Sequence, residues 1–81
     1  MRVADTIAHP RMRIIIYTLD KHYYVEFEAG PMKQGFRFSK EQTGGTEGVK
    51  QIVRGTLTDN VEERFHKMHA DALEAVKEAG F

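Results

Sequence analysis

Three runs of alternating residues between 11 and 39 constrain the fold of this chain more than any other feature. β-Branched and aromatic side chains dominate these runs, and such side chains favour the pleated surface of a sheet. Two short breaks, Asp20-Lys21 and Gly30-Pro31, separate the runs at the spacing of tight turns. The sequence therefore predicts a three-stranded antiparallel β-meander over residues 11–39.

The alternation also assigns a face to each side chain, because successive side chains of a strand point to opposite sides. One face of the predicted meander gathers apolar side chains that suit a core: Ile14, Ile16, Val25, Phe27, Phe36 and Phe38. The other, which we call the outer face, mixes charged, aromatic and apolar side chains: Arg13, Ile15, Tyr17, Tyr24, Glu26 and Arg37.

Residues 1–10 are predicted to form an arm or a short edge strand, and as a strand they would make the sheet four-stranded. Val3, Asp5 and Ile7 share one parity of a weak alternation. His9-Pro10 ends the segment, because a residue before proline is pushed into extended geometry and proline has no backbone donor.

The most regular helical pattern covers residues 59–79. Asp59 and Glu62 fit a capping box at its start, while Gly80 fits a left-handed end with Phe81 folding back as an apolar contact. A helix of this length spans roughly 30 Å, enough to cross the meander. Its apolar stripe consists of Val61, Phe65, Met68, Ala72, Ala75, Val76 and Ala79. We predict that this amphipathic helix packs across one face of the sheet, with its alanines close to the strands.

A second, shorter helix is predicted over residues 46–54. Thr46 fits its cap and Gly55 its end, whereas residues 41–48 have the composition of a loop. One side of this helix carries Val49, Ile52 and Val53. The whole chain, 1–81, is thus predicted to be a single α+β domain.

Composition narrows the class of protein. The chain has 12 Lys and Arg against 12 Asp and Glu, whereas nucleic-acid-binding domains usually carry a basic excess. The sequence has no cysteine, so disulfides and thiolate zinc sites are excluded. No apolar run is long enough to span a bilayer and the first residues lack a signal-peptide core, so we expect a cytoplasmic protein. A chain of 81 residues buries a small core, which self-association often supplements.

We expect another surface to cover the outer face, because this face is partly apolar, whereas a sheet face opposite a single helix layer is usually polar. Ile15, Tyr17 and Tyr24 are too apolar for that pattern, and Arg13 and Arg37 flank them. Arginine and aromatic side chains are enriched in protein interfaces, which favours a homodimer or a protein partner. The alternative cover is intramolecular, by residues 1–10 or by the short helix.

Single-stranded nucleic acid is a further alternative for this face, with bases stacked on the two tyrosines. Glu26 and Glu28 argue against it, as does the formal net charge of zero. The sequence therefore favours a small, non-enzymatic protein that self-associates or binds a protein through Arg13, Ile15, Tyr17, Tyr24 and Arg37.

Glu62, His66 and His69 are the candidate metal ligands, since they lie on one flank of the long helix. Their spacing differs from HExxH, and ordinary pairing on a helix surface explains it better. Metal binding through these residues is therefore the second alternative function, behind nucleic-acid binding, and no cofactor is predicted. Catalysis is also not indicated, because the single serine, Ser39, has no histidine or acid beside it in the sequence.

The order of a tyrosine-rich hairpin, a meander and helices resembles small antitoxin domains of the HicB type. Those domains carry a proline–aspartate–glycine–cysteine stretch after the second strand, where this chain reads EAGPMKQG. Only a glycine and a proline are shared. The resemblance is one of topology alone, and we assign no family and transfer no function from it.

Overall fold

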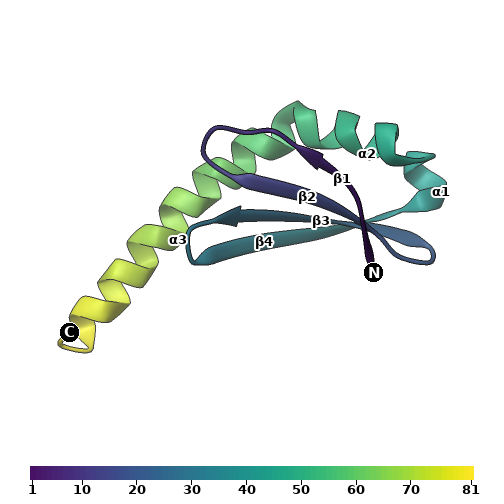
Figure 1. The fold of residues 1–81 in the computed structure, drawn as a ribbon. Coiled ribbons are helices and arrows are strands. Elements are labelled where there is room, and N and C mark those ends of the chain that lie inside the picture. The colour runs from purple at the N-terminus through teal and green to yellow at the C-terminus, as the bar shows by residue number, and fades with distance from the viewer.

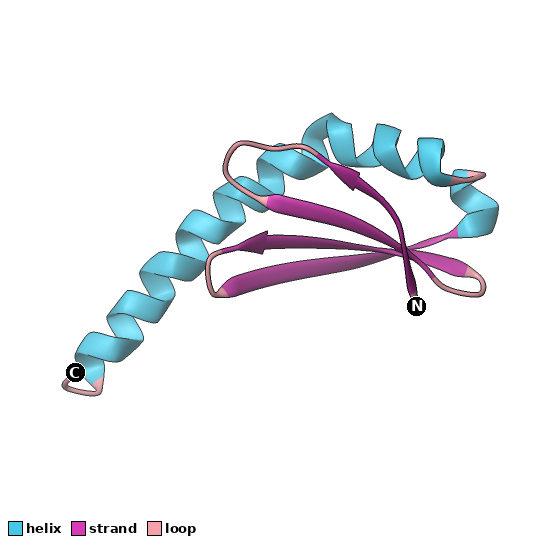
Figure 2. Ribbon diagram, viewed as in Figure 1, coloured by secondary structure: helices cyan, strands magenta, loops and turns pink.

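The computed structural model describes all residues, 1–81, and shows an α+β fold in which helices follow a four-stranded antiparallel sheet (Figure 1, Figure 2). The strands lie in chain order: β1 (Arg2–Ile7), β2 (Arg13–Thr18), β3 (His22–Ala29) and β4 (Met32–Ser39). The helices are α1 (Lys40–Thr43), α2 (Thr46–Ile52) and α3 (Thr58–Glu78). The predicted meander is confirmed, and residues 2–7 add the fourth strand at its edge.

β1 joins the sheet with an irregular register that decides where its side chains point. Val3 lies opposite Tyr17, whereas Asp5 lies opposite Ile16, so Ala4 is one extra residue in β1. A bulge of this kind shifts the alternation of faces by one residue. Val3 therefore lies on the outer face, whereas Asp5 and Ile7 lie on the inner face. The predicted common parity holds for Asp5 and Ile7 and is wrong for Val3.

The other three strands pair without a bulge, so their predicted faces hold. Ile14 lies opposite Phe27, and Ile16 lies opposite Val25. Phe36 and Phe38 share their face but are only partly buried, because β4 is the last strand of the sheet. The buried core consists of Met12, Ile14, Ile16, Tyr23, Val25, Phe27, Val49, Val53, Val61 and Phe65.

The helical layer begins earlier than predicted. The segment expected to be a loop starts with α1, where the hydroxyl of Ser39 accepts a hydrogen bond from the backbone N–H of Glu41. α2 confirms the predicted short helix, and its Val49 is fully buried against the sheet. Thr46 is not its cap, because Gly45 precedes the first turn and no side chain caps it.

A kinked π-helical turn, Val53–Leu57, joins α2 to α3, and the backbone leaves helical geometry at Gly55. The hydroxyl of Thr58 donates to the carbonyl of Val53 across the bend. The chain therefore enters α3 already helical, without a side-chain cap. The predicted capping box of Asp59 and Glu62 is wrong for this reason, and the carboxylate of Glu62 pairs elsewhere.

Only the first part of α3 packs against the sheet. Val61 and Phe65 are buried and Met68 is partly buried, but every residue from 69 onward is exposed. α2 and the kinked turn already cover part of the inner face, so α3 runs past the ends of the strands (Figure 1). The molecule is 48 Å long as a result, but only 23 and 19 Å wide. The prediction that this helix crosses the whole meander is therefore wrong. We call residues 70–81 the arm.

The end of the arm has the predicted backbone geometry. Gly80 has a φ of 83° and donates its N–H to the carbonyl of Lys77, while Phe81 donates to the carbonyl of Val76. These two bonds form the Schellman pattern that ends many helices. The side chain of Phe81 is 95% exposed, however, so the predicted apolar contact is not made.

Phe27 and Phe36 touch edge to face, with ring centroids 5.9 Å apart, but only Phe27 is fully buried. We predict that Phe27→Ala lowers the free energy of unfolding by about 3–5 kcal/mol, because it leaves a cavity in the core. Phe36→Ala should cost about half as much, since its ring already meets solvent. Urea unfolding measures both, and equal costs would contradict this placement of the core.

Candidate interaction sites

No other element of the chain covers the outer face of the sheet. β1 lies at the edge of the sheet, in line with the other strands, and α2 packs on the inner face (Figure 2). Both predicted intramolecular covers, residues 1–10 and the short helix, therefore lie elsewhere, and the intramolecular alternative is wrong.

The register places the five candidate residues Arg13, Ile15, Tyr17, Tyr24 and Arg37 together on this outer face. Three rows of side chains cross the strands from β2 to β4: Arg13–Glu28–Lys33, Ile15–Glu26–Gly35 and Tyr17–Tyr24–Arg37.

On much of the outer face, the side chains already shield or pair with one another. Ile15 is only 8% exposed although no helix lies over it, so its neighbours in the sheet shield it. The amine of Lys33 lies 3.8 Å from a carboxylate oxygen of Glu26 and 3.7 Å from one of Glu28. Charge pairs across strands are typical of a solvated sheet face. Stacking two such faces would desolvate these pairs, which makes this face less suited to a dimer than the sequence indicated.

Tyr24 lies along the sheet and does not project into solvent. Its ring stacks on Tyr17 with centroids 6.0 Å apart, and its hydroxyl donates to Glu26 over 3.4 Å. The absence of a side chain at Gly35 makes room for it, since a Cβ there would lie 2.6 Å from the ring carbon Cε1. Burial raises the pKa of Tyr24, and the charge of Glu26 adds to the effect. A glycine inside a strand is the sequence signal for such a close approach of a side chain to the backbone, but the sequence-based prediction did not include this role for Gly35.

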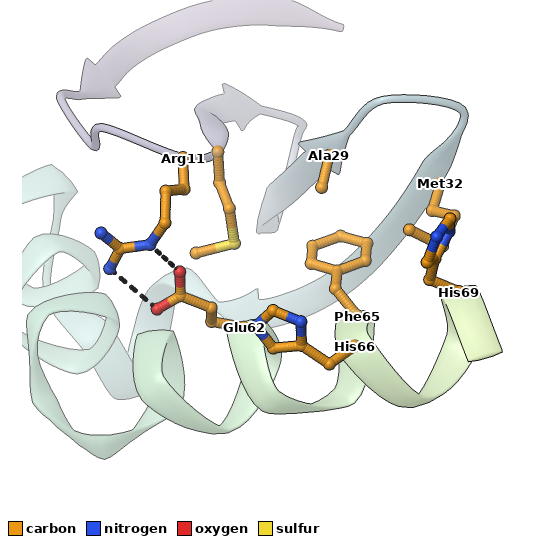
Figure 3. Close-up of a pocket in the computed structure, with 8 residues that line it drawn as sticks. Arg11, Ala29, Met32, Glu62, Phe65, His66 and His69 are labelled. Atoms are coloured by element: carbon orange, nitrogen blue, oxygen red, sulfur yellow. Dashed lines mark hydrogen bonds and ion pairs between the residues drawn. The ribbon is translucent and has the colours of Figure 1, made fainter.

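A pocket of about 190 Å³ opens where α3 leaves the sheet (Figure 3). Met12 and Phe65 are buried in its wall, and Ala29 and Met32 are partly buried beside them. The complete lining is Arg11, Met12, Ala29, Met32, Glu62, Phe65, His66 and His69. Sequence reasoning singled out the helix residues of this set but had no signal for the hairpin ends that meet them.

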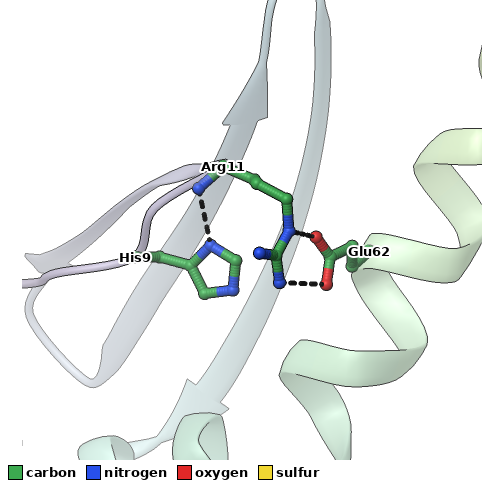
Figure 4. Close-up of polar contacts among 3 residues, drawn as sticks. All are labelled: His9, Arg11 and Glu62. Atoms are coloured by element: carbon green, nitrogen blue, oxygen red, sulfur yellow. Dashed lines mark hydrogen bonds and ion pairs between the residues drawn. The ribbon is translucent and has the colours of Figure 1, made fainter.

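Arg11 engages the carboxylate of Glu62, one of the candidate metal ligands (Figure 4). The guanidinium donates to both oxygens, one of them over 3.0 Å, and the N–H of Arg11 donates to Nδ1 of His9 over 3.1 Å. The hydrogen bond from Arg11 holds the pKa of Glu62 below its usual range. Glu62, His66 and His69 line one pocket, yet no three histidine or acidic side chains are placed to share a metal ion.

A second ion pair ties α2 to the edge strand. Lys50 contacts Asp5, and its amine also lies 3.6 Å from Glu47. The hydrogen bond from Lys50 lowers the pKa of Asp5. The bulge at Ala4 is what turns Asp5 toward α2, so the sequence alternation alone gave no sign of this pair. Inward charges and bulges of this kind protect an edge strand from pairing with other chains.

The arm carries the most exposed apolar surface in the helices. Leu73 and Val76 are 51% and 48% exposed, and Ala72 and Ala79 lie on the same side of the helix as Val76, with Ala75 at the edge of this side. The acidic side chains of the arm, Asp71, Glu74 and Glu78, gather on the opposite side, whereas Lys77 lies beside Leu73. Sequence reasoning found this stripe but assigned it to the protein's own sheet.

Comparison with known proteins places the chain in no family. No protein-family model, no curated protein and no solved structure gives a significant match. None of the helices combines the length and apolar character needed to cross a bilayer.

No polar or charged side chain is buried, and the shifted pKa values belong to the two ion pairs and to Tyr24.

Gly35→Ala should displace Tyr24 from the sheet, because the added methyl would overlap its ring. Loss of burial would lower the pKa of Tyr24 toward the ordinary tyrosine value of about 10. Absorbance titration in a Tyr17→Phe, Tyr23→Phe background isolates this group. An unchanged titration would show that Gly35 does not seat the ring.

The Arg11–Glu62 pair should stabilise the fold in a pH-dependent way. The pKa of Glu62 is lowered by folding, so its contribution is present above the ordinary value of about 4.3 and lost as pH falls through the folded pKa. Glu62→Gln should therefore destabilise the protein near neutral pH and much less in acid. Urea midpoints across this range measure the difference, and Glu63→Gln, with no ion pair, is the control. A pH-independent loss would contradict the assignment.

Proposed function

We propose that this protein is a non-enzymatic interaction module that self-associates through the arm of α3. The apolar stripe that packs on the sheet through Val61 and Phe65 continues past the sheet with nothing over it. This uncovered continuation of the apolar stripe is the main support for self-association.

The arm extends a helix that is already formed and packed on the sheet, but its own residues make no contact with the core. Its apolar side chains Leu73 and Val76 are therefore left in water. Their burial against another surface would add stability to the arm.

A second copy of the chain is the occupant that this surface fits best. It presents the same stripe, so one arm can cover the other in a two-fold contact that uses each surface once. The alanines allow two helix axes to approach closely, and the acidic residues of both arms would remain in solvent. Because the arms extend from the helical side, such a dimer leaves both outer sheet faces open (Figure 1).

A protein partner on the outer face is the second candidate. Arg37 makes no ion pair, and the exposed Val3 lies opposite Tyr17 in the register. These residues would form the apolar and cationic part of such a contact. Nucleic acid suits this face less, because Glu26 and Glu28 lie between the two arginines.

The cysteine-free composition is compatible with a reducing compartment, and the cytoplasm is our proposed location.

Sedimentation of the wild-type protein should show a concentration-dependent dimer at concentrations up to about 1 mM. Val76→Glu should give a monomer, because it places a charge within the apolar contact. Lys67→Gln lowers the net charge by the same single unit on the opposite side of α3 and should leave the dimer intact.

The comparison between these two variants separates the arm surface from net charge. A monomeric wild type over this concentration range would contradict self-association. A dimer that survives Val76→Glu as well as Lys67→Gln would show that the chains meet elsewhere, with the outer face as the next surface to test.

A further inference from the structure

The pocket at the base of the arm and the exposed side chain at its tip remain without a role. We infer that Phe81 of one copy fills this pocket in the second copy, so that the two arms exchange their tips. This inference rests on the self-association proposed above and specifies its geometry.

The pocket has the size and chemistry that an aromatic ring requires. Its volume is about 190 Å³, and an apolar cavity of about 150 Å³ is large enough to bind benzene. Met12 and Phe65 form buried wall, Ala29 and Met32 lie near the strand ends, and the rim carries the Arg11–Glu62 pair (Figure 3). An apolar interior with a polar rim is the usual anatomy of a site that receives a side-chain anchor.

The mouth of the pocket lies on the same side of α3 as the exposed apolar residues of the arm. His69 lines the pocket, and Leu73 lies four residues further along, so both share one side of the helix. Val76 follows three residues after Leu73 and continues this line. A partner arm that covers Leu73 and Val76 would therefore pass along the helix toward the mouth of the pocket.

Antiparallel pairing brings the tip level with that mouth. When Val76 of one arm faces Leu73 of the other, Phe81 lies about 7.5 Å further on, level with Met68 and beside His69. Parallel pairing would place the two tips together, away from both pockets. Phe81 cannot reach the pocket of its own chain, because the straight helix separates it from His69 by about 18 Å.

Insertion of the two rings would enlarge the contact between two short arms. A specific interface usually buries at least about 1,000 Å² in total. A phenylalanine buries about 150–250 Å², so two inserted rings would supply about 300–500 Å² of that area. Phe81 would then be a principal anchor of the dimer, as buried aromatic side chains are in other interfaces.

The first test measures the dimer dissociation constant of full-length variants by sedimentation equilibrium. Phe81→Ala removes the anchor and Ala29→Phe fills the pocket from within, so each should raise the dissociation constant at least about tenfold. The double variant should be no weaker than the worse single variant, because both changes remove one contact. Circular dichroism verifies that Ala29→Phe is folded.

The second test observes the pocket itself and does not depend on the fold of Ala29→Phe. With ¹³C-methyl methionine, the signals of Met12 and Met32 should shift on dimerisation through the ring current of the inserted phenylalanine. Met1, an exposed residue outside the pocket, should not shift, and Phe81→Ala should abolish the change at Met12 and Met32.

The outcomes separate this inference from the proposed function. A wild-type dimer with an unchanged dissociation constant in Phe81→Ala, and with static Met12 and Met32 signals, overturns tip exchange and leaves self-association standing. A monomeric wild type overturns both.

Discussion

Burial of one sheet face beneath the helical segment from Val49 to Phe65 is the interaction on which the rest of the structure depends. The side chains at its centre, Val25, Phe27 and Val53, are fully buried, and they join the middle of the sheet to the kinked turn. Only 11 of 81 residues are buried in all, a small core for holding one chain alone. A second source of burial is therefore physically useful to this fold, and the arm is placed to provide it.

Two surface ion pairs link the helices to the sheet around that core. Lys50–Asp5 joins α2 to the edge strand, and Arg11–Glu62 joins α3 to the segment between β1 and β2. Exposed pairs of this kind contribute little to stability, but a two-point contact between guanidinium and carboxylate restricts orientation. Arg11–Glu62 contacts α3 near the point where it leaves the sheet, and it forms the rim of the pocket there.

The two proposed surfaces do not compete. The arm continues the helical layer, whereas the outer face lies on the other side of the sheet (Figure 2). A dimer joined by its arms would present two outer faces, each with Tyr17, Tyr24 and Arg37 in one row. The charge ladder around Lys33 keeps most of each face compatible with water, so a partner would meet a small patch at its tyrosine end.

The sequence by itself determined the strands, their turns, the inner and outer faces of β2 to β4, and the existence of both main helices. These features follow from periodicity and turn residues, which act within a few neighbours along the chain. Tertiary structure alone decided the bulge at Ala4, the bend at Gly55 that replaced the predicted cap, and the exit of α3 from the sheet. Each depends on where distant segments meet: Asp5 turns inward to Lys50, and α2 takes up sheet surface that α3 would otherwise cover. The same stripe that indicated a core helix therefore became, in its second half, an exposed arm.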